Sequence, residues 1–202
     1  MKRFLILCMA MMVAAFSLAS PSAYAQVTAY AAGQGSVNSI TVGVDVRASV
    51  RGRCGFATGG APTGSIDQAD FDQTGFTKDF AIQLNCSGAS RIAVSSVNGG
   101  MAAAATSGQG YSAKAPYQVA LRMVADNGTS ASASCDASAL ASGGACSFAG
   151  VAGETKGLRL AGASTKANGS YLRVSAPAYS GADTLIEGRY SDTLSITVSV
   201  SP

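Results

Sequence analysis

The last residues before the C-terminus alternate strictly between apolar and polar side chains, and this pattern constrains the fold more than any other part of the chain. Its apolar positions are Leu194, Ile196, Val198 and Val200, separated by Ser195, Thr197 and Ser199. A period of two is typical of a β-strand with one face in a core and the other in water. Ile, Val and Thr also suit a pleated, half-buried surface. We therefore predict a final strand over about residues 187–200.

A second alternating stretch lies near the other end of the chain. Its apolar positions are Ile40, Val42, Val44, Val46, Ala48 and Val50. The residues between them are polar or small, so this stretch is also predicted to form a strand. Two interpretations stay open. It is either the first strand of the chain's own sheet or a strand that another copy of the protein receives.

The first residues have the form of an export signal. Lys2 and Arg3 precede an apolar run over residues 4–18, and Ala23-Tyr24-Ala25 is a cleavage site of the A-x-A type. We expect residues 1–25 to be removed, residues 26–39 to form a flexible leader, and residues 40–202 to form one domain. Without the signal the chain has 12 basic and 11 acidic residues. This balance gives no reason to expect nucleic acid or an acidic membrane surface as a partner.

Four cysteines remain after the signal: Cys54, Cys86, Cys135 and Cys146. An even number of cysteines in an exported chain indicates two disulfides, and four cysteines allow three connectivities. We favour pairing sequence neighbours, which gives Cys54–Cys86 and Cys135–Cys146. A metal site is the competing interpretation, but no cysteine spacing resembles C-x₂-C and the chain contains no histidine.

Further short alternating segments predict an all-β domain. The expected strands cover residues 80–86, 91–97, 117–123, 155–160 and 170–176, in addition to the two described above. Asn127-Gly128 supplies the positive φ angles of a hairpin turn. Residues 57–70 and 99–115 are expected to be loops, and residues 135–146 a stapled loop or hairpin. Strands at this spacing, with no helical period, indicate an antiparallel β-sandwich.

Catalytic constellations that depend on histidine are unavailable, because the chain has none. Carboxylate chemistry is formally possible, but the candidate residues lie in turn-like segments, where acidic side chains are usually solvated. These residues are Asp67, Asp70, Asp72 and Glu154. No glycine-rich phosphate loop follows a strand and opens a helix. We therefore expect no enzymatic activity, no cofactor and no metal.

A specific resemblance lies in the stretch from Glu187 to Val198. It contains Gly188, Tyr190, Ser191, Asp192 and Thr193, followed by the alternating strand. In this the chain resembles the spore coat protein U family, which includes pilin subunits of the archaic chaperone–usher pathway. The export signal, an alternating strand before the first mature cysteine, and a cysteine closing Leu84-Asn85-Cys86 also match. Only the last fifteen or so residues are specific.

The resemblance implies an immunoglobulin-like sandwich that lacks one strand. The gap lies beside the C-terminal strand, and a periplasmic chaperone fills it until the N-terminal strand of the next subunit replaces the chaperone. The donor would be the stretch from Ile40 to Val50, or else residues 26–39 with weak apolar positions at Val27, Ala29, Ala31 and Val37. Such strand addition combines backbone hydrogen bonds with side chains that fill pockets. Head-to-tail insertion does not close on itself and yields a filament.

The expected function is thus a structural subunit of an exported pilus or surface filament. Its expected partners are other subunits, a periplasmic chaperone and an outer-membrane usher, without membrane insertion. The alternative is a self-complete secreted sandwich that serves as a coat component or a carbohydrate-binding module. For Tyr190 and Asp192 we expect structural roles and no ligand binding. Tyr190 packs a corner of the sandwich, and Asp192 accepts hydrogen bonds from backbone groups of a turn.

Overall fold

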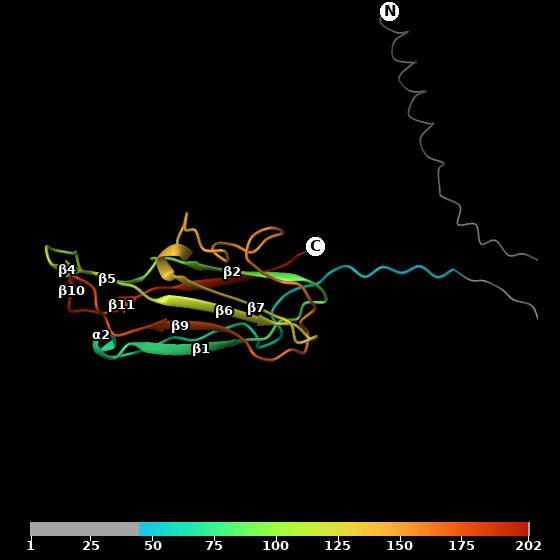
Figure 1. Cartoon of the computed structure of the whole chain (residues 1–202), viewed down its shortest axis with the longest axis horizontal. Helices are drawn as coiled ribbons and strands as arrows, with labels where there is room; N and C mark the ends of the chain where they lie inside the picture. The colour runs from blue at the N-terminus through green and yellow to red at the C-terminus, as the bar shows by residue number, and fades with distance from the viewer. Residues whose placement is uncertain (1–44, 202) are drawn as a thin grey trace, which may run out of the picture. The chain divides into compact units, whose positions relative to one another are not determined.

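The computed structural model describes residues 45–201, which form an all-β sandwich of mainly antiparallel sheets (Figure 1). The chain divides into two units, residues 1–49 and 50–202, and every described strand belongs to the second unit. The predicted signal, the leader and residues 40–44 of the first alternating stretch lie outside the described residues. Residues 45–50 are irregular and exposed.

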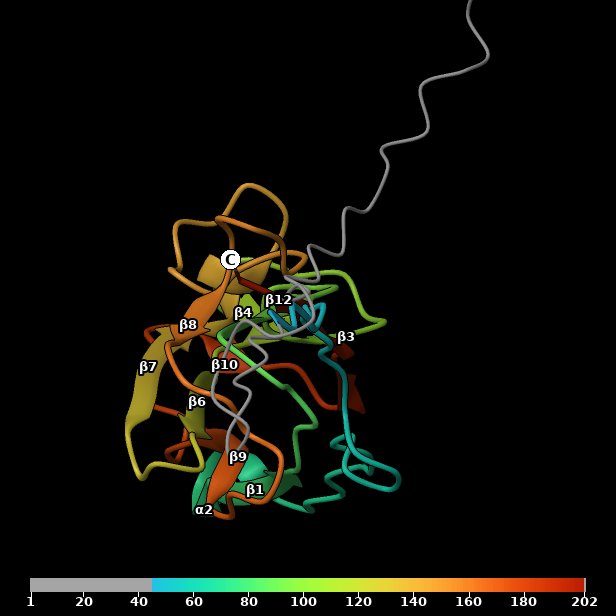
Figure 2. The same ribbon diagram turned by 90° about the vertical axis from the view of Figure 1, so that its right-hand side faces the viewer.

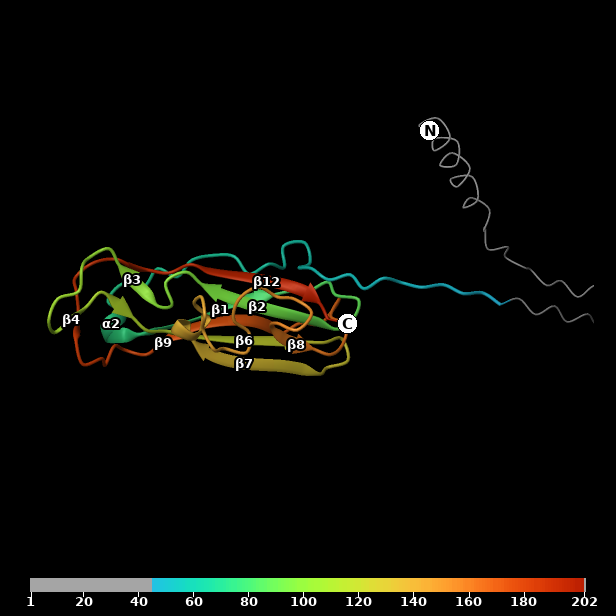
Figure 3. The ribbon, with the colours of Figure 1, turned by 90° about the horizontal axis from the view of Figure 1, so that it is seen from above.

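Two sheets face each other (Figure 2). The larger sheet has the order β1-β9-β6-β7, formed by Phe76–Ile82, Ser170–Ala176, Gln118–Val124 and Ser130–Asp136. The smaller sheet has the order β12-β2-β8, formed by Leu194–Val200, Ser90–Ser96 and Leu158–Leu160. All pairings in both sheets are antiparallel. The final strand is therefore at the edge of the smaller sheet (Figure 3).

Several short elements gather at one end of the sandwich (Figure 1). β11 (Tyr190–Ser191), β3 (Met101–Ala103) and β5 (Lys114–Ala115) form one small sheet, and β10 (Thr184–Leu185) pairs in parallel with β4 (Tyr111–Ser112). α2 is a single turn over Phe71–Thr74, and a 3-10 turn covers Ala137–Leu140. No helix within residues 45–201 has the length and apolar character needed to cross a membrane.

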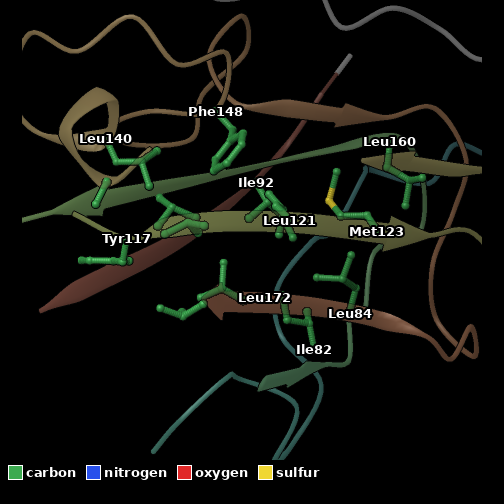
Figure 4. Packing of buried hydrophobic residues seen from close by; sticks show 14 of the residues in the cluster. Ile82, Leu84, Ile92, Tyr117, Leu121, Met123, Leu140, Phe148, Leu160 and Leu172 are labelled. Atoms are coloured by element: carbon green, nitrogen blue, oxygen red, sulfur yellow. The ribbon is translucent and has the colours of Figure 1, made fainter. Parts of the chain in front are cut away.

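The core lies between the two sheets, and side chains from both contribute to it (Figure 4). Val119, Leu121 and Met123 of the central strand β6 are at most 1% exposed. Ile92 of β2 and Phe148, from the segment between the 3-10 turn and β8, belong to the same core and are fully buried. The alternation of the sequence therefore places one face of each central strand inside, because successive side chains of a strand point to opposite faces.

Both disulfides that the sequence analysis favoured are present. Cys54–Cys86 has a Cα–Cα distance of 4.0 Å, and Cys135–Cys146 has one of 6.0 Å. The first disulfide ties the segment that precedes β1 to the residues that follow β1. Next to it, the Ser87 N–H donates to the Arg53 carbonyl over 2.9 Å. Two disulfides fit a protein that matures in an oxidising compartment.

The segment from Gly52 to Ile66 runs along the side of the sandwich between β12 and β1 (Figure 2). It starts beside Val200: a Cβ at Gly52 would lie 3.8 Å from that side chain. Further along, Gly64 lies under the ring of Phe80 in β1. Phe56 and Ile66 pack against the core from this segment.

Some predicted boundaries were wrong. The expected strand over residues 80–86 starts earlier, as β1, and continues past Ile82 only as isolated bridges at Leu84 and Cys86. The expected loop over residues 99–115 contains β3, β4 and β5. The loop or hairpin expected over residues 135–146 overlaps the end of β7, because Cys135 and Asp136 belong to that strand. The small residues of β7 that face the core still allow it to pair with β6 over its whole length. The predicted final strand is split at Asp192 and Thr193 into β11 and β12.

Candidate functional site at the edge of the last strand

The backbone of β12 is hydrogen-bonded on one side only within residues 45–201. At its two ends the Val97 N–H donates to the Thr193 carbonyl over 3.1 Å, and the Ser201 N–H donates to the Ala89 carbonyl over 2.9 Å. In an antiparallel pair, alternate residues point their N–H and C=O groups toward the partner strand. The backbone N–H and C=O groups of the odd-numbered residues of β12 therefore point toward β2. Those of the even-numbered residues point away from β2, along the plane of the sheet. No described strand pairs with that outer side.

The apolar side chains of the same strand are only partly covered. Leu194, Ile196 and Val198 pack against the core but are half-buried, and Val200 is 40% exposed. Their neighbours across the ladder in β2, such as Ile92 and Val94, are fully buried. The apolar side chains of β12 are therefore more exposed than those of the neighbouring strand β2. An apolar edge with free donors and acceptors is a template for another strand.

Asp192 fixes the start of this strand. Its carboxylate accepts hydrogen bonds from the Ser96 hydroxyl over 2.5 Å and the Tyr117 hydroxyl over 2.7 Å. It also accepts backbone hydrogen bonds from Asn98, Gly100 and Thr193, at 3.0, 3.3 and 2.7 Å. One carboxylate thereby connects β12 to β6 and to the turn that follows β2.

The hydrogen bonds to Asp192 also set the ionisation of the pair. Burial alone would raise the pKa of Asp192, but the hydrogen bonds, led by that from Ser96, bring it below its usual value. Burial raises the pKa of Tyr117, and its hydrogen bond to the Asp192 carboxylate raises it further. The carboxylate is therefore charged and the phenol neutral at neutral pH.

Tyr190 has a structural environment as well. Its hydroxyl donates to the carbonyl groups of Ile186 and Ser112, at 2.8 and 3.0 Å. Its ring meets Phe71 edge to face, with 5.5 Å between centroids. Tyr190 and Asp192 thus occupy the roles that the sequence analysis kept foremost. The partners Ser96 and Tyr117 could not be identified from sequence, because each is about 75–96 residues from Asp192 and carries no motif.

The two proposed strand partners are described to different extents. All four acceptor positions of the sequence analysis lie on β12, on its core-facing side. Of the donor positions, Val46, Ala48 and Val50 are described, and they form no strand. Val46 is 82% exposed and Val50 is 87% exposed. Ile40, Val42 and Val44 lie outside the described residues.

The acidic residues considered for carboxylate chemistry are each exposed, in agreement with solvated side chains. They are Asp67, Asp70, Asp72 and Glu154. Within residues 45–201, histidine, cysteine and carboxylate side chains form no group of three or more that could hold a metal ion.

A second carboxylate, that of Asp126 in the turn between β6 and β7, holds the loop that connects β8 to β9. Asp126 accepts hydrogen bonds of 2.8–3.0 Å from the backbone N–H groups of Thr165, Lys166 and Ala167 and from the Thr165 hydroxyl. These bonds, led by the one from Lys166, lower the pKa of Asp126 to about 2.

Replacing Asp126 by asparagine is expected to weaken the acid dependence of stability. Because the folded pKa is depressed, the stabilisation by the charged group is present above the unfolded pKa of about 4 and is lost as the pH falls toward about 2. Urea unfolding at several pH values across this window measures the change. Asp136→Asn is the control, since its side chain makes no capping hydrogen bond. If the free energy of unfolding changed with pH equally in wild type and in Asp126→Asn, this role of Asp126 would be contradicted.

No family model, no curated protein and no solved structure matches this chain. Function must therefore be argued from the β12 edge itself. The resemblance to spore coat protein U pilins stays a prediction.

Proposed function

We propose that the chain is a structural subunit of an exported chaperone–usher pilus or surface filament and that it polymerises by donor-strand exchange. The observation that carries the proposal is the outer edge of β12, where backbone groups without a strand partner coincide with half-buried apolar side chains. A single added strand would hydrogen-bond to the even-numbered residues and cover Leu194, Ile196 and Val198.

The first alternating stretch supplies a donor of suitable chemistry. Val46 and Val50 extend into solvent, and Ala48 between them is exposed too. Each large apolar side chain that becomes fully buried contributes about 1.5–3 kcal/mol, so several in one strand hold a subunit firmly. In a head-to-tail polymer the donor of one copy occupies the β12 edge of the next.

The apolar edge of β12 also explains why the proposal includes export through the periplasm, a chaperone and an usher. An apolar strand edge promotes edge-to-edge aggregation unless it is covered. A periplasmic chaperone would cover β12 before assembly, and an outer-membrane usher would exchange it for the donor. The two disulfides are consistent with that compartment.

Val46→Asp is expected to prevent polymer formation while leaving the fold of the subunit intact. The side chain is 82% exposed, so the substitution removes no packing from the described domain. In the polymer it would place a charge in an apolar pocket, which is strongly unfavourable. Ser49→Asp is the matched control, because residue 49 lies on the opposite face of the donor. It should still polymerise.

The test uses protein recovered from the cell surface, run unboiled and boiled on a denaturing gel. Strand-exchanged polymers appear as a ladder of multiples in the unboiled lane and collapse to one band on boiling. Wild type and Ser49→Asp should give the ladder, and Val46→Asp should not. A single band in every unboiled lane, from folded protein, would refute the proposal.

The second candidate is a self-complete secreted sandwich. The observation in its favour is the segment between β12 and β1, whose Phe56 and Ile66 already pack against the core. This candidate predicts a stable monomer that needs no chaperone, so the same gel separates the two functions.

A further inference from the structure

A cleft of about 520 Å³ is lined by residues of α2 and β10. These two elements lie at the same end of the sandwich (Figure 1). α2 contributes Asp72 and Gln73 to its lining, and the stretch before and within β10 contributes Tyr179, Asp183 and Thr184. We propose that this cleft binds a saccharide that carries free hydroxyl groups and no acidic substituent. The proposal does not rest on strand exchange, because none of these residues belongs to β12.

The two walls of the cleft are tied together. The Tyr179 N–H donates to the Asp72 carbonyl over 2.7 Å, which joins the turn after β9 to α2. The Tyr179 side chain lies directly over Gly181, where a Cβ would collide with its ring. On the other side the Thr184 N–H donates to the Gly110 carbonyl over 3.0 Å. The cleft is thus built before any ligand enters, as most small-molecule sites are.

Its chemistry combines an aromatic surface with hydrogen-bonding groups. The half-buried ring of Tyr179 offers an apolar face, and a pyranose ring has a matching face of C–H groups. Carboxylates accept hydrogen bonds strongly, and Gln73 both donates and accepts, so neighbouring hydroxyls of a sugar find partners.

Charge selects among saccharides. Asp72 and Asp183 form no ion pair with any described residue, and no basic side chain lines the cleft. A uronate or sulfated sugar would bring like charges together and be rejected. Neutral sugars fit, and amino sugars gain additional attraction.

Isothermal titration calorimetry on the purified full-length exported protein tests the proposal. The probes are cellohexaose, a glucosamine hexamer, a galacturonate hexamer and spermidine, which carries positive charge without a sugar face. We expect binding of the first two and none of the galacturonate. Tyr179→Ala and Asp183→Asn should each weaken binding by about tenfold or more. Glu154→Gln, an exposed carboxylate elsewhere, should leave it unchanged.

Two results would overturn the proposal. One is no heat of binding for any saccharide at millimolar concentration. The other is binding of spermidine as tight as that of the glucosamine hexamer and independent of Tyr179, which would mean simple attraction of cations to two carboxylates. Thermal unfolding of each variant confirms that it is folded. The polymer ladder of the Tyr179→Ala variant should match wild type, so failure here and failure of the filament proposal are distinguishable.

Discussion

Replacing Asp192 by alanine is expected to lower the free energy of unfolding by about 3–5 kcal/mol, because it leaves several buried groups without a partner. The hydroxyls of Tyr117 and Ser96 both donate to this carboxylate, and both residues are at most 5% exposed. Three backbone N–H groups lose their acceptor as well. Urea unfolding at neutral pH measures the loss.

Two further variants isolate the cause. Asp192→Asn keeps one acceptor oxygen but points an amide donor at groups that are themselves donors, so an intermediate loss is expected. Asp136→Ala removes an exposed carboxylate and should change stability by no more than about 0.5 kcal/mol. The folded pKa of Asp192 is lowered, so its contribution is present above the unfolded value and is lost as the pH falls. The difference in the free energy of unfolding between wild type and Asp192→Asn should therefore become smaller in acid. Equal stability of Asp192→Ala and Asp136→Ala would contradict the stabilising role of the Asp192 hydrogen bonds.

The longer strands could be predicted from the sequence because they carry large apolar residues with a period of two. Ser170–Ala176 was predicted with its observed bounds, and Gln118–Val124 and Ser90–Ser96 differ from prediction by one residue. In each, burial of one face requires the alternation. The Asn127-Gly128 turn between β6 and β7 was also predicted, and Gly128 has the positive φ of 82° that it needs.

The elements that were missed have weak local signals. β7 alternates serine with alanine and cysteine, so its inward face differs little in hydrophobicity from its outward face. It is held as a strand by pairing with β6 over seven residues, which is a tertiary effect. The two- and three-residue strands at the α2 end also depend on partners far along the chain, such as Tyr190 opposite Ala103.

The candidate site divides in the same way. The acceptor positions of β12 follow from its alternation, because the sequence tells which side chains share a face. That β12 lies at a sheet edge does not follow, since strand order depends on contacts between distant segments, β12 with β2 and β2 with β8. The bland roles of Tyr190 and Asp192 were anticipated, but the hydrogen-bonding partners of Asp192 were not. The cleft at Tyr179 likewise brings together residues from α2 and β10.

Appending a second copy of residues 40–50 after Pro202, through a short glycine-rich linker, is expected to give a monomer of higher stability. β12 ends at Val200, so an appended strand that turns back would run antiparallel along its outer edge. Complete burial of even two valine side chains would raise the free energy of unfolding by at least about 3 kcal/mol. The fused chain should show no ladder on an unboiled gel, although its own N-terminal segment is intact, because its acceptor edge is filled.

A matched fusion separates this effect from the added length. If the appended copy carries Val42→Asp and Val44→Asp, the linker and chain length are unchanged, but charges face the core and the strand cannot dock. That control should polymerise like the parent chain and unfold at the same denaturant concentration. Were the unaltered fusion to polymerise equally well and gain no stability, the outer edge of β12 would not be the acceptor, and the outward backbone groups of Leu194, Ile196 and Val198, which have no strand partner among the described residues, would need another explanation.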